Sequence, residues 1–320
     1  MTPTLSIVIL SYNTRSLTLN CLNSITKDKN LAIAGFTPPN RRPSSTPTEI
    51  IVVDNASTDD SVAYLKKISF IKLIINKKNQ GFSAGNNQGL AHASGNYLLF
   101  LNSDTVILHS AISQALDWLS SHPEANACSA QLLNADKSIQ IAGGFLPNLA
   151  NILTWITGLD DLPLVNTLIP PFHPHPPSFY THDRFYLKDR QLEWLHGAFI
   201  LIRTASIKNI AGFDSNYFMY GEEIDLFYRL KLSGQASNRY LIGPQIIHFG
   251  GASSSTKSFP LSREYQGLLY FFKKHKPEWQ YQLVKILFKF NPTLYLRALF
   301  FSICGKKEKA RSYFDTISQI

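Results

Sequence analysis

The sequence predicts an α/β fold, with a doubly wound, mostly parallel sheet, flanking helices and a C-terminal helical extension. Three observations support this prediction. Four short apolar runs rich in β-branched residues alternate with helical patterns over the first 120 residues. Three of these runs end in polar residues, and ligands of open parallel sheets bind beyond such strand ends. The segment 256–320 is instead basic, with apolar residues at helical spacings.

The first half of the chain supplies the expected βα units. The predicted strands cover residues 5–13, 49–57, 70–79 and 96–107. The predicted helices cover residues 15–27, 59–68, 87–94 and 110–121. Because each strand is an almost continuous apolar run, we expect it to be buried on both faces.

The second half is less regular. Residues 145–182 hold only two charges, and six prolines stand between 163 and 177. This pattern predicts a long, apolar and irregular insertion, which in a compact domain is usually functional. Regular patterning resumes in predicted strands at 194–203 and 239–251 and in predicted helices at 204–213 and 224–234.

These patterns predict one domain over residues 1–255, with a first half at about 1–120 and a second half at about 121–255 that contains the insertion at 145–190. The segment 256–320 would form a basic amphipathic helical tail.

Composition narrows the class of protein. Hydrophobic residues make up 44% and charged residues 17% of the 320, which is typical of a folded globular chain. Cys21, Cys128 and Cys304 are odd in number and far apart, so they predict neither a disulfide framework nor a zinc site. The N-terminus has no basic segment before its apolar run, and no stretch has the roughly 18 uncharged apolar residues of a spanning helix. We therefore expect a cytoplasmic protein.

Polar strand ends are the first candidates for chemistry. One predicted strand ends in Asp54, and another ends in the triplet Asn102-Ser103-Asp104. A carboxylate at such a place can accept hydrogen bonds from a nucleoside or hold a divalent cation that also binds phosphate. For either acid taken alone, a helix cap or a turn is an equally ordinary role.

Two further segments and one histidine are candidates. The glycine-bearing segment 79–86 leads into a predicted helix, whose N–H groups suit a diphosphate, but it is neither a GxGxxG nor a P-loop motif. Glu222, Glu223 and Asp225 could complement a helix dipole or raise one another's pKa for general base catalysis. His248 follows a strand and would matter for a ligand only if Asp104 holds a metal.

Seven segments in this order resemble the family 2 glycosyltransferases of the GT-A fold. They are SIVILSYN, EIIVVDNASTDDS, NKKNQGFSAGNNQG, YLLFLNSDT, GAFILIR, AGFDSNYFMYGEEIDLFYR and IIHFGGAS, within residues 5–252. The LNSDT and HFGGAS forms are most similar to the rhamnosyltransferase-type subgroup. The resemblance implies an inverting transfer of a sugar, with rhamnose favoured, from a nucleoside diphosphate to a hydroxyl of a glycan or lipid-linked acceptor in polysaccharide biosynthesis.

The resemblance implies that residues 1–255 are the catalytic domain, with a nucleotide-sugar half at about 1–120 and an acceptor half at about 121–255. It also implies roles for single residues. The nucleotide sugar would contact Tyr12, Asn13, Asp54, Asn79, Gly81, Phe82, Asn86, Asn102 and Ser103. Asp104, which matches the last acid of the family's DxD-like motif, and His248 would hold Mg²⁺ or Mn²⁺. Asn102 replaces the first acid of that motif, so metal affinity would be modest. Glu223 would be the base, with Asp225 and Glu222 as alternatives, because Glu stands where the family's GED-type motif has Asp.

The tail carries most of the net charge. Residues 257–320 hold 12 Lys or Arg and 4 Asp or Glu, which gives +8 of the +9 of the whole chain. An anionic membrane surface is the expected partner, at the inner face of the cytoplasmic membrane. A helical cap packed on the catalytic domain is the alternative, and no nucleic-acid motif accompanies the charge. A second functional hypothesis is a non-catalytic module that binds nucleotide sugars or glycans on the same fold.

Overall fold

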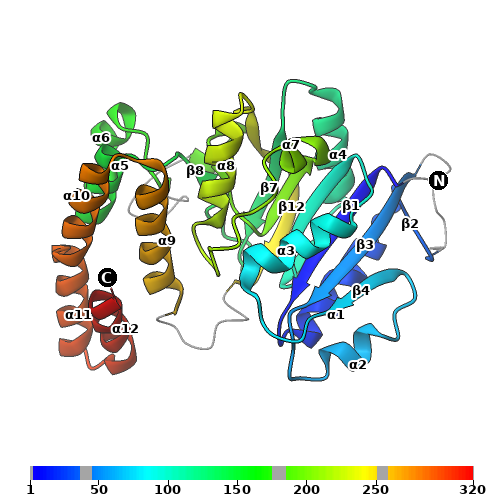
Figure 1. The fold of residues 1–320 in the computed structure, drawn as a ribbon, viewed down its shortest axis with the longest axis horizontal. Helices are drawn as coiled ribbons and strands as arrows, with labels where there is room; N and C mark the ends of the chain where they lie inside the picture. Colours follow the sequence, from blue (N-terminus) through cyan, green and yellow to red (C-terminus); the bar gives the residue numbers. More distant parts are fainter. Residues whose placement is uncertain (1–2, 37–44, 175–184, 251–258, 320) are drawn as a thin grey trace.

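The computed structural model describes residues 3–36, 45–174, 185–250 and 259–319. A twisted sheet with helices on both faces forms one part, and a layer of helices lies at the end away from the N-terminus (Figure 1). The layer contains both the predicted insertion and the predicted tail. The predicted fold class, a doubly wound α/β sheet with a C-terminal helical extension, is confirmed.

Ten strands of the described residues form the central sheet. Their order is β2-β3-β1-β5-β11-β7-β12-β6, with β4 also beside β3 and β9 beside β12. The strands β1 to β5 pair in parallel, whereas β11 is antiparallel to both of its neighbours. The bounds are β1 (Leu5–Ser11), β2 (Leu31–Ile33), β3 (Thr46–Asp54), β4 (Ile71–Ile75), β5 (Tyr97–Asn102), β6 (Thr105–Ile107), β7 (Ala127–Leu133), β9 (Arg190–Leu192), β11 (Phe199–Arg203) and β12 (Asn238–His248). A separate pair joins β8 (Gly143–Gly144) and β10 (Trp194–Leu195).

The helices fall into two groups. Those that flank the sheet are α1 (Arg15–Thr26), α2 (Ser61–Leu65), α3 (Gly81–His92), α4 (Ala111–Ser121), α7 (Thr204–Asn209) and α8 (Glu222–Leu232). Those of the helical layer are α5 (Leu149–Thr157), α6 (Pro163–Leu168), α9 (Phe259–His275), α10 (Glu278–Lys289), α11 (Pro292–Ile303) and α12 (Lys307–Gln319). Short 3₁₀ turns cover Leu159–Asp161 and Phe185–Leu187. None of these helices, within the described ranges, combines the length and apolar character that crossing a bilayer requires.

The predicted strand 96–107 is two strands with a turn between them. β5 ends at Asn102, and the Thr105 hydroxyl donates to the Asn102 carbonyl (2.8 Å) across the turn. β5 pairs with β1 and β11, whereas β6 pairs with β12. The turn therefore holds Ser103 and Asp104 between two parts of the sheet.

The insertion is more regular than its composition predicts. α5 begins with a capping box, in which the Asn148 side chain accepts from the Asn151 N–H and the Asn151 side chain accepts from the Asn148 N–H. It ends at Gly158, whose φ of 72° is the left-handed conformation typical of a helix C-cap. The expectation of an irregular segment was therefore wrong over α5 and α6, and the Asn148 and Gly158 signals were legible in the sequence.

The tail begins with a helix that packs on the rest of the fold. α9 packs on α8, α10 and α12, and its Leu268, Phe271 and Phe272 are fully buried in the hydrophobic core. Gly267 allows the approach, because a Cβ there would lie 2.3 Å from the carbonyl oxygen of Tyr220. The boundary at 255/256 stays a prediction, although α9 packs as closely as the helices before it.

Candidate active site

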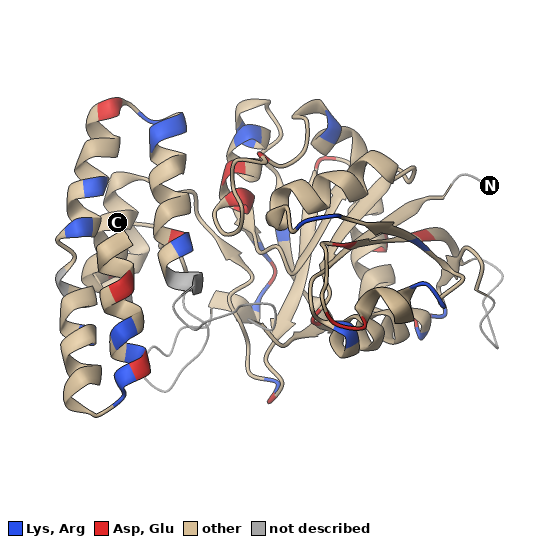
Figure 2. Ribbon diagram, turned by 60° about the horizontal axis from the view of Figure 1, so that its bottom comes forward, with Lys and Arg blue, Asp and Glu red and all other residues tan. Residues whose placement is uncertain are grey.

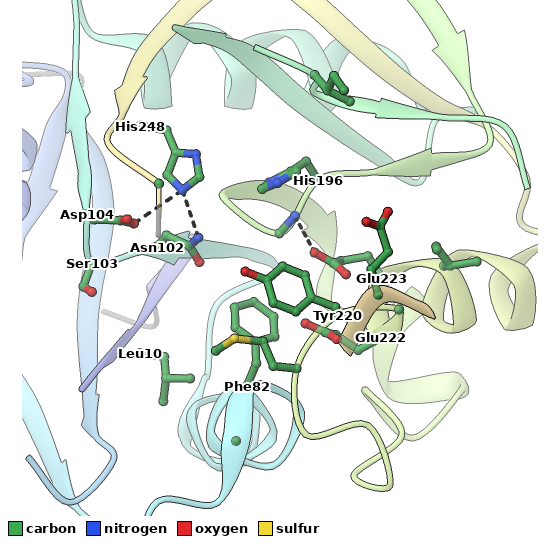
Figure 3. A pocket seen from close by; sticks show the side chains of 18 of the residues that line it. Leu10, Phe82, Asn102, Ser103, Asp104, His196, Tyr220, Glu222, Glu223 and His248 are labelled. Carbon is green, nitrogen blue, oxygen red and sulfur yellow. Dashed lines mark hydrogen bonds and ion pairs between the residues drawn. The ribbon is translucent and has the colours of Figure 1, made fainter. Parts of the chain in front are cut away.

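A pocket of about 730 Å³ opens beyond the carboxyl ends of β1 and β5. Its lining comes from both halves of the predicted catalytic domain and from the helical layer, as Figure 3 shows for the central residues. Polar strand-end residues lie on one side, and the carboxylates that open α8 lie on the other. This is the place where open α/β sheets bind ligands.

Most of the residues predicted to bind the nucleotide sugar line this pocket. They are Tyr12, Asn79, Gly81, Phe82, Asn102 and Ser103. α3 begins at Gly81, six residues earlier than predicted, so most of the glycine-bearing segment is helical. At the start of this helix the Gly81 N–H donates to the Asn79 side-chain oxygen (2.9 Å) and the Phe82 N–H donates to the Phe218 carbonyl (2.6 Å), so these two N–H groups already have acceptors within the protein.

Three predicted residues lie outside the lining and hold the surrounding loops. The Asn13 side-chain oxygen accepts from the Thr58 N–H (2.7 Å), and the Asn86 side-chain amide donates to the Phe82 carbonyl (3.0 Å). Asp54 is fully buried and accepts from the Ser57 N–H (2.9 Å). The other Asp54 carboxylate oxygen has no hydrogen-bond partner among the described residues.

The sequence analysis did not select Asn55 as a site residue. Asn55 lines the pocket, and its side chain holds the neighbouring segment 79–81 in place. Its side-chain amide donates to the Asn79 side chain (2.8 Å) and to the Gly81 carbonyl (3.1 Å). Its side-chain oxygen accepts from the Gln80 N–H (3.1 Å). The signal was its position directly after Asp54 at the end of a buried strand.

The predicted metal ligands come together at the floor of the pocket. Asp104 Oδ1 lies 3.4 Å from His248 Nε2, and Asn102 Nδ2 lies 3.4 Å from the same nitrogen. Burial alone would raise the pKa of Asp104, but the hydrogen bond and the charge of His248 hold it below its usual value. The carboxylate is therefore ionised at neutral pH.

Gln140 orients the imidazole of His248. Its side-chain NH₂ donates to the His248 carbonyl (2.7 Å), which turns its oxygen toward His248 Nδ1 (3.0 Å). Nδ1 thus donates to Gln140, and Nε2 faces Asp104. Asp104 and the imidazole of His248 offer one oxygen and one nitrogen donor, a pair of ligands that a divalent metal can use. Among the described residues, however, no group of three His, Cys, Asp or Glu side chains gathers as a complete metal site.

His196 stands beside this pair and was also missed. Its ring lies 5.5 Å from the ring of His248. Burial, with the charges of His248 and His173, lowers the pKa of His196 to about 3. It is therefore a neutral ring in the pocket wall.

Two of the three candidate bases face the pocket, and the main one is Glu223. Its Oε1 accepts from the Gly197 N–H (3.0 Å), and a Cβ at Gly197 would lie 2.6 Å from that oxygen. Burial raises the pKa of Glu223 above its usual value. The side chain is nevertheless partly exposed in the pocket, so an acceptor hydroxyl could reach it.

Glu222 is more deeply enclosed than Glu223. It is 2% exposed, and its Oε2 has no hydrogen-bond partner within the described ranges. Burial raises its pKa strongly, and the negative charge of Glu223 raises it further. Glu222 is therefore the member of the pair that keeps a proton.

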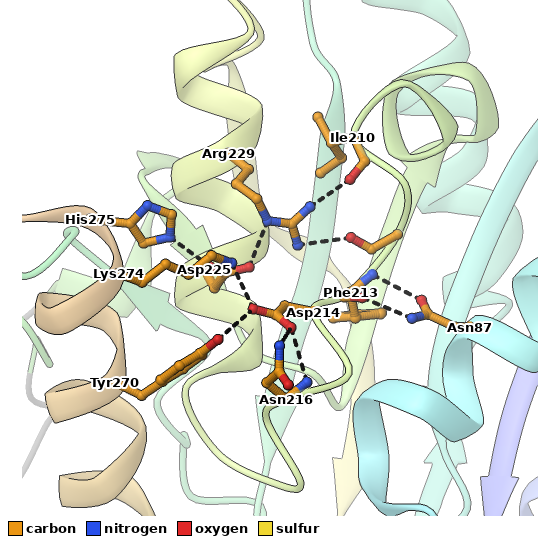
Figure 4. Close-up of polar contacts among 11 residues, drawn as sticks. Asn87, Ile210, Phe213, Asp214, Asn216, Asp225, Arg229, Tyr270, Lys274 and His275 are labelled. Atoms are coloured by element: carbon orange, nitrogen blue, oxygen red, sulfur yellow. Dashed lines mark hydrogen bonds and ion pairs between the residues drawn. The ribbon is translucent and has the colours of Figure 1, made fainter.

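Asp225 lies on the other side of α8 and does not line the pocket. Its carboxylate accepts from Arg229 Nε (2.6 Å), Lys274 Nζ (2.6 Å) and His275 Nε2 (2.7 Å), as Figure 4 shows. Burial alone would raise its pKa, but these three partners lower it to about 2. A carboxylate that accepts from three side chains, two of them the cationic Arg229 and Lys274, is a poor base, so the geometry disfavours this alternative.

The pocket wall beyond Glu223 comes from the insertion and the tail. His173 Nε2 lies 2.8 Å from Glu264 Oε1, and both residues line the pocket with Trp194. The sequence analysis selected none of the three. Glu264 is one of four acids in the mainly basic tail, and no local pattern in the sequence marks His173.

The fold identifies the class of protein first. A mannosyltransferase from Pyrobaculum calidifontis, whose structure contains GDP-Man and Mn²⁺, superposes with a TM-score of 0.53 at 13% identity, over 100% of this chain and 85% of that one. At that identity the likeness concerns the fold alone. The fold is that of the GT-A glycosyltransferases, as predicted.

The family follows from the sequence. The profile of the family described as glycosyl transferase family 2 matches residues 6–157. The N-acetylglucosaminyl-diphospho-decaprenol L-rhamnosyltransferase of Mycobacterium tuberculosis is 26% identical over 63% of this chain and 66% of its own length. The rhamnosyltransferase WbbL of Escherichia coli K12 is 29% identical over 56% of this chain and 64% of its own length.

Residues 6–157 thus match the family 2 glycosyltransferases, and the predicted resemblance to this family and its rhamnosyltransferases is confirmed. The chain spans just under two thirds of the length of these two relatives.

Proposed function

We propose that the chain is an inverting glycosyltransferase that moves a sugar, with rhamnose favoured, from a nucleoside diphosphate to a hydroxyl of a glycan or lipid-linked acceptor. The observation that carries this proposal is one pocket with polar strand ends on one side and Glu223 on the other. The two relatives that are rhamnosyltransferases support the choice of sugar, and the decaprenol-linked substrate named for one of them supports a lipid-linked acceptor.

The chemistry assigned to this chain is a single displacement. Glu223 takes the proton of the acceptor hydroxyl, whose oxygen forms a bond to the anomeric carbon while the bond from that carbon to the diphosphate oxygen breaks. The diphosphate leaves with the electron pair. The Gly197 N–H holds the Glu223 carboxylate toward the pocket.

Asp104 and His248 would hold the metal, with Gln140 fixing the imidazole. A bound Mg²⁺ or Mn²⁺ would supply charge compensation for the departing diphosphate. The Mn²⁺ in the mannosyltransferase structure supports this proposal. Asn102 donates its amide toward His248, which supports a ligand role for the acid and the imidazole rather than for the amide.

The basic tail and the apolar insertion support the proposal that the reaction takes place at the inner face of the cytoplasmic membrane, in the synthesis of a cell-envelope polysaccharide. The basic charge of the tail supports an anionic lipid surface as a partner. Peripheral attachment would bring the enzyme to a lipid-linked acceptor without a spanning helix.

Thermal shift with nucleoside diphosphates tests donor binding. We expect dTDP with Mn²⁺ to raise the melting temperature, because a ligand that binds only the folded state stabilises it. Asp104→Ala should abolish the additional shift that Mn²⁺ gives, while Asp136→Ala, at an exposed turn, should not. An unchanged Mn²⁺ effect in Asp104→Ala would remove Asp104 from the metal site.

Turnover separates an enzyme from a binding module. The expected result is metal-dependent consumption of dTDP-rhamnose, with inversion at the anomeric carbon seen by NMR in the product of a hydroxyl acceptor. Donor binding without hydrolysis or transfer, with Glu223→Gln equal to the unchanged protein, would favour the non-catalytic module instead.

A further inference from the structure

Helix α10 has apolar residues on two opposite sides. Val284 and Phe288 are fully buried against the rest of the helical layer. On the solvent side, large apolar residues recur at intervals of four, three and four: Trp279, Leu283, Ile286 and Phe290. Trp279 is 61% exposed. A surface helix of a water-soluble layer normally carries polar residues on that side.

Helix α11 repeats this arrangement. Leu294 and Ala298 are buried, whereas Leu296, Leu299, Phe300 and Ile303 are exposed, Ile303 by 86%. α11 continues α10 along one column at the edge of the molecule in both views (Figures 1 and 2). We call the eight exposed residues of α10 and α11 the outer apolar stripe. Exposed apolar patches of this extent mark a site of interaction.

Beyond Glu278 at the start of α10, the charges along the stripe have one sign. Between Glu278 and Glu308 the chain has five Lys or Arg residues and no acid. Lys285, Lys289 and Arg297 are exposed on the same two helices. Lys and Arg side chains can extend past an apolar surface and place their charges beyond it.

This charge pattern indicates which kind of partner binds the outer apolar stripe. A second copy of this chain would bring five cations against five cations, with no acid within the segment to pair with them. An anionic bilayer offers both an apolar interior and negative headgroups, and Trp is favoured at its interface. We propose that the outer apolar stripe inserts into the interface of an anionic membrane, with α10 and α11 lying along its surface.

Membrane contact through the stripe would also set the orientation of the pocket relative to the membrane, an inference that rests on the proposed function. α9 and the insertion belong to the same helical layer and supply Glu264 and His173 to the wall beyond Glu223. α5 of the insertion packs on both α10 and α11. The end of the pocket that would receive the acceptor is therefore the end built by the membrane-binding layer.

Trp279 gives a direct probe of insertion. Of the four tryptophans, Trp194 is buried, Trp118 and Trp155 are half-buried, and Trp279 is exposed. We expect vesicles of phosphatidylglycerol and phosphatidylcholine to shift the emission of the full chain to the blue, and lipids brominated on the acyl chains to quench it. Trp279→Phe should lose most of both effects while keeping vesicle binding.

Co-sedimentation measures the contribution of the stripe. The variant Ile286→Gln/Leu296→Gln/Leu299→Gln/Ile303→Gln should bind vesicles at least roughly a hundredfold more weakly, because four exposed apolar side chains no longer leave water. The matched control Leu232→Gln removes an equally exposed leucine from α8 and should bind as before. Lys285→Ala/Lys289→Ala/Arg297→Ala should lose on the order of a hundredfold on anionic vesicles and nothing on neutral ones.

Equal binding of the stripe variant and the unchanged protein would overturn the proposal. So would concentration-dependent dimerisation of the unchanged protein, lost in the stripe variant, with no vesicle binding by either. The donor-induced thermal shift should be the same in all of these variants. If vesicles bind but no donor shifts any protein, the proposed function fails and the membrane surface stands.

Discussion

Helix α8 carries three acids within its first turn, and its two sides treat them in opposite ways. On the pocket side, burial raises the pKa of Glu223, whose carboxylate accepts from the backbone N–H of Gly197. On the other side, Arg229, Lys274 and His275 surround Asp225 and lower its pKa. The comparison shows that spacing in the sequence brings these acids into one helical turn. Their burial and the partners that other elements supply then decide whether the pKa of each acid is raised or lowered.

The ion pairs of Asp225 also fix the position of the pocket side of α8. Lys274 bridges Asp225 (2.6 Å) and Asp214 (2.7 Å), which ties α9 to α8 and to the loop before it. Arg229 further donates to the Gly212 carbonyl (2.8 Å). Glu223 and the Glu264 of α9 thus keep their places because Asp225 joins the elements that carry them.

The largest expected effect is on stability, and it should come from removing the ion pairs of Asp225. Asp225→Ala leaves Arg229 and Lys274 without their shared partner, so we expect a loss of about 3–5 kcal/mol in the free energy of unfolding. Urea denaturation measures it. Asp315→Ala is the control, because its pair with Arg311 is exposed and 3.8 Å long, and it should cost less than about 0.5 kcal/mol. A loss below about 1 kcal/mol for Asp225→Ala would mean that the network is not structural.

Glu223→Gln should have the next largest effect, on catalysis. It keeps the shape and removes the basicity, so transfer should fall by roughly a hundredfold or more while donor affinity holds. Its stability should not fall, because an uncharged amide avoids the cost of a buried carboxylate. Steady-state kinetics with a donor titration measures both. If Asp225→Asn, assayed well below its melting temperature, gave this pattern and Glu223→Gln did not, the base would be Asp225 and not Glu223.

The two sides should also respond to pH in opposite directions. The ion pairs of Asp225 stabilise the fold above the usual Asp pKa of 3.8, and their contribution is lost as the pH falls toward about 2. Glu223 has a pKa above its usual 4.5, so its charge costs stability as the pH rises through that range, and kcat/KM rises as the proton leaves. Unfolding and rate profiles against pH, measured on the same protein, check both signs.

The smallest effect should come from Glu264. Its negative charge raises the pKa of Glu223, so Glu264→Gln should move the acidic limb of the kcat/KM profile to lower pH. Glu278→Gln, an exposed acid at the start of α10, is the control and should leave that limb in place. A shift to higher pH would show that Glu264 acts through its pair with His173 and not through its charge on Glu223.

The sequence predicted the strand-end side of the pocket better than the side built by the insertion and the tail. Asn79, Asn102 and Asp104 lie at the ends of local βα patterns, so their meeting at one sheet edge follows from strand order. His173 and Glu264 come from segments 91 residues apart and meet only through packing, and no local pattern announces their contact. Their roles, like those of the other site residues, stay predictions.

The sequence by itself determined the sheet, the family and the cluster of acids at the start of α8. Each of these depends on residues within a few positions of one another, whose spacing and capping are local. Only the tertiary structure decided which acid is paired, which helix completes the pocket and which side of α10 and α11 stays exposed. Burial and charge pairing depend on elements distant in the chain, and these two quantities set a carboxylate's pKa and the availability of an apolar surface.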